Sequence, residues 1–323
     1  MPGLPAALTG RVTDAAYAAG WWGVRALPET VARTSFAYGA DLGRARDGKG
    51  VQRLRRNLRR VLACTQGPDH AEDGLDELVA AGMRSYSRYW RETFRLPGMD
   101  KVAVAARAAA GTEGAEHIDA AMDRGRGLIL ALPHSGNWEV AAVWLVAHGV
   151  PFTTVAERLK PESLFDRFVA YREGLGMEVL ALSGGAQPPA DVLAERLRAG
   201  KAICLLADRD MSRQGVPVEF FGAAATMPPG PSLLAARTGA TLLPVHVSFT
   251  GTGTRDEGWR QWIGPPVDLG GGSLRDRVAT GTQALATHFE EHIGQAPQDW
   301  HMLATLWTDD RSGPPRGAPK LEA

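Results

Sequence analysis

A histidine and a glutamate stand five positions apart at the point where an apolar run of the sequence ends. The run Gly127–Leu132 has the length of a strand, Pro133 interrupts it, and His134 follows at once. Glu139 falls in the first turn of a helix that Asn137 is suited to cap. An imidazole held by a carboxylate can take a proton from a hydroxyl near neutral pH. We therefore expect His134 to act as a general base, with Glu139 bonded to one ring nitrogen and fixing its tautomer.

The polar residues around this pair are expected to support the chemistry. Ser135 lies outside any Gly-x-Ser-x-Gly elbow, so capping or binding is favoured over nucleophilic attack. Gly136 permits a tight turn, and helix N-terminal N–H groups near it are candidates for binding an oxyanion. Asp208 and Asp210 resemble a metal pair, but no further ligand spacing accompanies them, and a carboxylate–arginine network without metal is predicted instead.

Charged residues also follow two other short apolar runs, Phe152–Val155 and Ala202–Ala207. In open α/β sheets, ligands bind beyond the carboxyl ends of the strands. These charged residues are therefore predicted to position substrates, although surface ion pairs of little energetic value are the alternative. The substrate-binding candidates are Glu157, Arg158, Arg172, Asp208 and Arg209, with Lys160 as a further cation.

Five short apolar runs alternate with helical patterns from residue 127 onward. This alternation predicts an α/β fold with a mostly parallel central sheet flanked by helices. The expected strands are Gly127–Leu132, Phe152–Val155, Glu178–Leu182, Ala202–Ala207 and Thr241–Phe249. Upstream of them, a helix with an aromatic stripe is expected at about Asp73–Arg95, where core packing is favoured over ligand binding.

The N-terminal part of the chain is basic and carries paired tryptophans, Trp21 and Trp22. Residues 1–62 hold eleven Lys/Arg against four Asp/Glu, although the whole chain has no formal net charge. Val51, Leu54, Leu58, Val61 and Leu62 follow the helical period, with Arg53, Arg55, Arg56, Arg59 and Arg60 on the flanks. This pattern fits a helix that docks on an anionic membrane surface, or one packed on the domain with a solvated basic face.

Three regions are therefore expected: a basic, aromatic helical region at 1–66, an α/β domain at 67–308 and a mobile tail at 309–323. A zero net charge argues against a dedicated nucleic-acid binder, and basic residues without interleaved aromatics do not fit single-strand binding. The two cysteines, Cys64 and Cys204, suggest neither a disulfide framework nor a zinc site. No apolar run is long enough to predict a transmembrane helix.

The block His-Ser-Gly-Asn-Trp-Glu at 134–139, in its order with later blocks, resembles the lysophospholipid acyltransferase superfamily, whose signature is His, four residues, then Asp or Glu. The later blocks Asp208-Arg209-Asp210 and Phe220-Phe221-Gly222 are similar to those of the branch that holds the lipid A late acyltransferases. Glu157-Arg158-Leu-Lys-Pro and Trp300-His-Met-Leu resemble the phosphatidylinositol mannoside acyltransferases of actinobacteria.

The resemblance implies a glycerol-3-phosphate acyltransferase-like fold and acyl transfer from acyl-CoA, with palmitoyl-CoA the expected donor, to a mannose hydroxyl of a phosphatidylinositol mannoside. It implies no bound cofactor, and a peripheral, monomeric enzyme on the cytoplasmic face of the plasma membrane. The acyl chain would need an apolar groove, expected near Trp144 and Phe168. Another glycolipid acceptor, an acyl-CoA thioesterase and a non-catalytic lipid-binding protein remain as alternatives.

Overall fold

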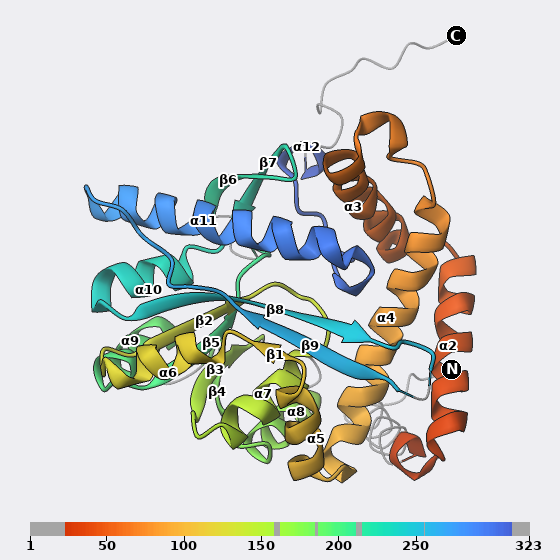
Figure 1. Ribbon diagram of the computed structural model, residues 1–323, viewed down its shortest axis with the longest axis horizontal. Helices are drawn as coiled ribbons and strands as arrows, with labels where there is room; N and C mark the ends of the chain where they lie inside the picture. Colours follow the sequence, from red (N-terminus) through yellow and green to blue (C-terminus); the bar gives the residue numbers. More distant parts are fainter. Residues whose placement is uncertain (1–22, 158–161, 185–186, 211–214, 255, 312–323) are drawn as a thin grey trace, which may run out of the picture.

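A seven-stranded sheet runs through the centre of the molecule (Figure 1), in the strand order β1-β9-β8-β2-β5-β3-β4. The computed structural model describes residues 23–157, 162–184, 187–210, 215–254 and 256–311. Neighbouring strands are parallel except β8 and β9. The strands of this sheet are β1 Thr112–Glu113, β2 Leu128–Leu132, β3 Phe152–Ala156, β4 Glu178–Ala181, β5 Ala202–Leu206, β8 Thr241–Thr250 and β9 Gly258–Ile263. The mostly parallel α/β sheet predicted from the sequence is confirmed.

Helices cover both faces of this sheet, and α2, α3 and α4 stand together beside it (Figure 1). Their bounds are α2 Glu29–Ala45, α3 Lys49–Gln66, α4 Leu75–Arg95, α5 Lys101–Ala109, α6 Ala115–Asp123, α7 Trp138–Ala147, α8 Glu162–Glu173, α9 Pro189–Arg198, α10 Gly230–Thr238, α11 Leu274–Gln295 and α12 Thr308–Arg311. A two-stranded antiparallel hairpin, β6 Val216–Phe220 and β7 Ala223–Met227, lies outside the main sheet.

Strand β2 lies in the middle of the sheet and is buried on both sides. Leu128, Leu130 and Leu132 pack into the core that α5, α6, α7 and α8 cover. Ile129 and Ala131 point to the opposite face and pack with α9, α10 and α11. A continuous run of Leu, Ile and Ala suits this place because both faces of a central parallel strand must be apolar.

Helix α3 has the predicted amphipathic arrangement. Its apolar positions are buried: Val51, Leu54, Leu58, Val61 and Leu62. Most of them pack with Leu75 and Val79 of α4. The basic region therefore packs on the rest of the protein, whereas its docking on a membrane stays a prediction. Trp21 and Trp22 lie outside the described residues.

The described residues contain no helix that combines the length and apolar character needed to cross a membrane. Of the predicted C-terminal tail, residues 309–311 belong to the short helix α12, and Asp310 pairs with Arg60 of α3. The remaining residues of that tail lie outside the described part of the chain.

Candidate active site

His134 and Asp208 meet at the carboxyl ends of two neighbouring parallel strands. Leu132 of β2 is paired in register with Leu206 of β5. His134 comes two positions after Leu132, and Asp208 comes two positions after Leu206. The His134 Nδ1 atom lies 2.6 Å from the Asp208 Oδ1 atom, and the His134 backbone N–H donates to Oδ2 over 2.9 Å. The Asp208 side chain is fully buried, whereas 26% of the His134 side chain is exposed. The exposed part of the imidazole can therefore contact a substrate while Asp208 holds the Nδ1 atom on the buried side.

The charge of Asp208 is stabilised in spite of burial. Burial raises the pKa of this carboxyl, but the charge and hydrogen bonds of His134 and a hydrogen bond from Trp300 lower it, and the net pKa lies below its ordinary value. A buried carboxylate bonded to His134 Nδ1 fixes the tautomer that leaves Nε2 free to accept a proton.

The orienting carboxylate is therefore Asp208 and not Glu139, which corrects the sequence-based geometry. Glu139 lies in the first turn of α7 with its side chain 1% exposed, and it forms an ion pair with Arg172 of α8. The Arg172 Nη2 atom lies 2.7 Å and its Nε atom 3.1 Å from Glu139 Oε1. Burial lowers the pKa of Arg172, but the facing Glu139 carboxylate raises it, and the net pKa lies above its ordinary value. Whether catalysis needs Glu139 stays a prediction.

A C-terminal segment lies antiparallel to the loop that carries His134. The His301 N–H donates to the His134 carbonyl over 2.7 Å, and the Gly136 N–H donates to the Asp299 carbonyl over 2.9 Å. Ser135 and Trp300 form the bridge between these two contacts. The Trp300 indole Nε1–H donates to Asp208 Oδ2 over 2.9 Å. The loop is thus held by backbone bonds along its length.

Two titratable side chains of this segment share the hydroxyl of Ser85 on α4. Ser85 donates to Asp299 Oδ1 over 2.7 Å and lies 2.9 Å from His301 Nε2. Burial raises the pKa of Asp299 to about 6, and burial with the nearby His134 charge lowers the pKa of His301 to about 3. Burial thus favours the neutral form of both groups behind the loop.

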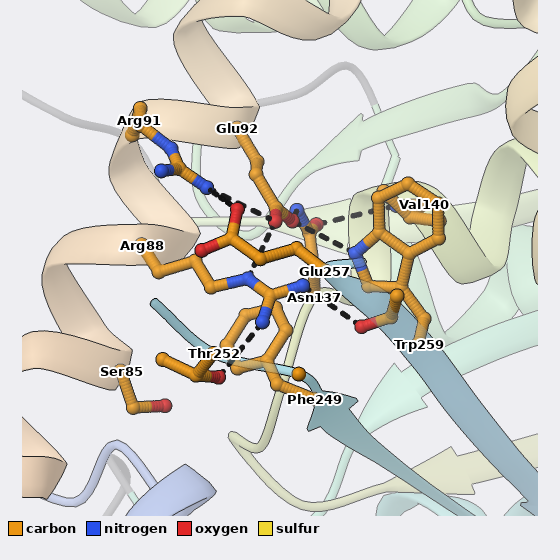
Figure 2. A network of polar contacts seen from close by, with 12 residues as sticks. Ser85, Arg88, Arg91, Glu92, Asn137, Val140, Phe249, Thr252, Glu257 and Trp259 are labelled. Carbon is orange, nitrogen blue, oxygen red and sulfur yellow. Dashed lines mark hydrogen bonds and ion pairs between the residues drawn. The ribbon is translucent and has the colours of Figure 1, made fainter. Parts of the chain in front are cut away.

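A buried polar network holds the start of α7 (Figure 2). Asn137 is the predicted N-cap: its Oδ1 atom accepts from the N–H groups of Glu139 and Val140. Its Nδ2 donates to Glu92 Oε2 over 2.8 Å, and the Trp259 indole donates to the same oxygen over 2.8 Å. Because an amide has one acceptor and one donor side, Glu92 fixes which side faces the helix.

Arginines of α4 surround Glu92 (Figure 2). Arg88 Nε donates to Glu92 Oε1 over 2.7 Å, and Arg91 pairs with Glu257. The guanidinium of Arg88 also reaches the Thr252 hydroxyl over 2.8 Å. Each carboxylate in this buried cluster therefore faces a cation, which reduces the energetic cost of burying charge.

The turn before α7 leaves few of its N–H groups for an oxyanion. The Gly136 N–H is bonded to Asp299, and Asn137 caps the N–H groups of Glu139 and Val140. Oxyanion binding by N–H groups near Gly136 therefore stays a prediction, and of these groups the three named here, including that of Gly136, are already bonded. The predicted role of Gly136 in a tight turn is confirmed: φ is +56°, and a Cβ would lie 2.5 Å from the Val247 carbonyl oxygen, so only glycine fits.

The other residues that the sequence singled out for the site differ in where they lie in the structure. Glu157 and Arg209 are exposed, and no hydrogen bond or ion pair joins either to another described residue. Arg158 and Lys160 lie outside the described residues. The Ser135 hydroxyl is buried without a partner among the described residues, which does not favour a nucleophile. Substrate binding by Glu157, Arg158 and Arg209 stays a prediction.

An apolar pocket lies between α7 and the sheet, and the Glu139–Arg172 pair is part of its lining. Trp138 lines it, and the Trp138 ring lies edge-on to the His134 ring with centroids 5.8 Å apart. Trp144 lines the pocket as predicted, whereas Phe168 belongs to the adjoining core and not to the lining. Other lining residues are Ile118, Leu130, Leu132, Ala141, Leu145, Phe152, Met177, Leu205, Val245 and Ile263.

Sequence reasoning assigned no part in the chemistry to Trp300, Glu92 or Asp299. Trp300 stood in a block that the resemblance singled out, but that block carried no role. Glu92 lies within the predicted aromatic helix, where an acid among apolar residues gives only a weak signal. The one available indication was a charged residue at a position that the helical period places on the buried side of this helix.

This geometry defines a class of protein: a parallel-sheet enzyme with a His–Asp pair next to an apolar pocket. The family described as bacterial lipid A biosynthesis acyltransferase matches residues 6–309, and the chain belongs to this family. It is therefore an acyltransferase.

Two relatives are similar along nearly their whole length. Phosphatidylinositol mannoside acyltransferase of Mycolicibacterium smegmatis is 51% identical over 305 residues, which cover 94% of each chain. Phosphatidylinositol mannoside acyltransferase of Mycobacterium tuberculosis is 50% identical over 305 residues, 94% of this chain and 92% of the relative. A lipid A biosynthesis acyltransferase of Haemophilus influenzae is 24% identical over 62% of this chain and 59% of the relative.

Proposed function

We propose that this protein transfers a long acyl chain from acyl-CoA to a mannose hydroxyl of a phosphatidylinositol mannoside, with His134 as the general base. The acceptor is supported by the names of relatives that are about half identical over 94% of the chain. The base is supported by the His134–Asp208 contact, which is the observation that carries the mechanism. The apolar pocket beside it suits a fatty acyl chain.

The proposed reaction is a direct transfer without a covalent acyl-enzyme. His134 Nε2 takes the proton from the acceptor hydroxyl as its oxygen attacks the thioester carbonyl carbon. The new O–C bond forms, the C–S bond breaks, and the thiolate of CoA leaves. The proton held by His134 then passes to that thiolate. Asp208 stabilises the imidazolium that exists between these two proton transfers.

Glu139 and Arg172 have a supporting part in this proposal. Their ion pair joins α7 to α8, and both residues line the apolar pocket together with Trp138. We assign to this pair the positioning of the pocket wall near the thioester. Glu157, Arg158 and Arg209 are proposed to bind the polar parts of donor or acceptor, since in the sequence they come directly after β3 and shortly after β5, and ligands bind beyond the carboxyl ends of such strands.

The test combines purified protein, palmitoyl-CoA and phosphatidylinositol mannoside, with products identified by mass spectrometry. His134→Ala should lower acyl transfer by about 10²–10⁴-fold, because the proton transfer is lost. His70→Ala is the matched control, since His70 Nδ1 also bonds an aspartate, Asp73, over 2.8 Å but lies on the surface near the end of α3. Transfer should be unchanged in that variant.

Full activity of His134→Ala would remove the proposed base. Release of free fatty acid at the same rate with and without acceptor would show a thioesterase in place of a transferase. Binding of palmitoyl-CoA without turnover would show a lipid-binding protein. Transfer to a lipid A-like acceptor but not to the mannoside would correct the acceptor.

A further inference from the structure

Trp300 contacts the proposed catalytic pair from behind. Its indole Nε1–H donates to Asp208 Oδ2 over 2.9 Å, and the same oxygen accepts the His134 backbone N–H over 2.9 Å. Asp208 Oδ1 faces His134 Nδ1. Among the described residues, the buried carboxylate thus divides its charge among three donors, of which the indole is the only one that does not belong to His134.

The position of the indole is fixed by the chain on either side. Backbone bonds join Asp299 and His301 to the His134 loop. The Trp300 ring is fully buried and packs on Phe220, Phe221 and Trp307, with centroids 5.8–6.2 Å apart. These backbone bonds and ring contacts hold the indole donor toward Asp208.

We propose that Trp300 is a positioning residue that sets the basicity of His134 by withdrawing negative charge from Asp208. This inference rests on the proposed function, because it needs His134 to act as a base. A hydrogen bond to a carboxylate stabilises its charge and so weakens what it offers to a second partner. Without the indole donor, Asp208 would stabilise the imidazolium of His134 more strongly.

The pH dependence follows from this step. As the pH falls, His134 becomes protonated and can no longer accept the proton of the acceptor hydroxyl. A stronger stabilisation of the imidazolium moves this loss of activity to higher pH. The other titratable and charged groups on the packed elements include Asp299 and His301, the Glu139–Arg172 pair and the exposed Arg209. They also include the buried Asp210, and Tyr86, Tyr89, Arg88 and Glu92 of α4. No hydrogen bond joins the Trp300 indole to any of them among the described residues.

The test compares Trp300→Phe with Trp307→Phe. Trp307 is a matched control: it is fully buried in the same aromatic cluster, and its indole donates over 2.9 Å to the Phe220 carbonyl, away from Asp208. Each substitution removes one indole donor and about the same apolar contact. The measurement is kcat/KM for acyl transfer against pH, with kcat and KM separated.

In Trp300→Phe, the acid limb of the kcat/KM profile should move upward by about 0.5–1 pH unit, a part of the strength of a charge-assisted hydrogen bond. The activity on the plateau should stay within about threefold, because the base itself remains. Trp307→Phe should keep the wild-type acid limb. Coincident acid limbs in the two variants, or a downward shift in Trp300→Phe, would overturn the inference.

A second measurement applies if Trp300→Phe does not fold. This measurement uses protein that is labelled with ¹⁵N-tryptophan and carries Trp138→Phe. The substitution removes the indole whose ring lies beside His134. Trp144 and Trp262 also lie on histidine rings, so their indole N–H signals should titrate in every variant. One further indole N–H signal should titrate, and its titration should vanish when His134→Ala is added. No such signal would overturn the inference. A failure of the proposed function would be distinguished from this result, because His134→Ala would then still transfer the acyl chain.

Discussion

At the scale of single residues, a histidine can be recognised in the sequence more readily than its partner. His134 was predicted from the residues around it, and Glu139 was chosen because it lies in the next turn. The partner in the structure, Asp208, is 74 residues away along the chain. Nothing in the local sequence shows that β2 and β5 are neighbours, since β3 and β4 come between them in the chain. Strand order therefore decided the partner.

The Glu139–Arg172 pair permits a prediction about stability. Glu139→Gln and Arg172→Met should each lower the free energy of unfolding by about 3 kcal/mol, because each leaves one buried charge without its partner. The double variant should lose less than either single variant, since no unpaired charge remains. Urea unfolding at neutral pH measures all four proteins.

Costs that simply add in the double variant would show that the two side chains do not depend on each other. Acyl transfer by the folded double variant gives a separate result for the Glu139–Arg172 pair. Lost transfer in a double variant whose free energy of unfolding is close to that of the wild type would support a need for this pair in catalysis.

At the scale of helices and strands, the sequence was most informative where the period was strong. All five strands predicted from apolar runs are present, and the helix capped by Asn137 begins at Trp138. Strand β9 was not predicted because its six residues do not alternate between apolar and polar types: Arg260 is followed by the buried Gln261, and Trp262 by Ile263. The hairpin β6–β7 was not predicted from the sequence, and its two-residue turn at Phe221 and Gly222 has positive φ at both positions.

The cap of α7 gives a prediction that propensity alone would reverse. Aspartate caps helices as well as asparagine does. Asn137→Asp should nevertheless destabilise the protein by about 1 kcal/mol more than Asn137→Ala, because it places a second carboxylate against Glu92 where an N–H now donates. Urea unfolding near pH 7.5 measures the difference.

Asp100 provides the control for this comparison. It caps α5 by accepting from the N–H groups of Val102 and Ala103, the same pattern as at Asn137, but it is exposed and has no facing carboxylate in the described structure. Asp100→Asn should change the free energy of unfolding by less than about 0.5 kcal/mol. If Asn137→Asp were equally mild, Glu92 would not constrain the cap.

At the scale of the whole molecule, charge is unevenly distributed, and the structure shows how much of it is already engaged. Arg55 pairs with Asp76, Arg59 with Glu72 and Arg60 with Asp310. Three of the five arginines that suggested a membrane-docking helix therefore face acids of the same chain. Arg53 and Arg56 have no ion pair with another described residue, and Arg56 is exposed.

We propose that this face of α3 docks on an anionic membrane surface, with Arg53 and Arg56 as its free cations. Replacing both by alanine should weaken binding to anionic vesicles by about tenfold and reduce its dependence on salt. Arg124→Ala with Arg126→Ala is the charge-matched control, since both are exposed just before β2 at the amino ends of the strands. Vesicle sedimentation measures both pairs.

Equal losses in the two pairs would indicate attraction by overall charge and not by a face of α3. No loss in either pair would end the docking proposal, and the basic face of α3 would then be solvated.

The position of Trp300 in the chain has a consequence for how the protein folds during its synthesis. Its contact with Asp208 spans 92 residues, and the segment that holds the histidine loop is among the last described residues to leave the ribosome. Domains fold during synthesis from the N-terminal side, so the sheet can assemble before this segment arrives. A nascent chain would thus contain an assembled sheet before Asp208 has its indole donor, and the proposed catalytic pair would be completed only after Trp300 has emerged.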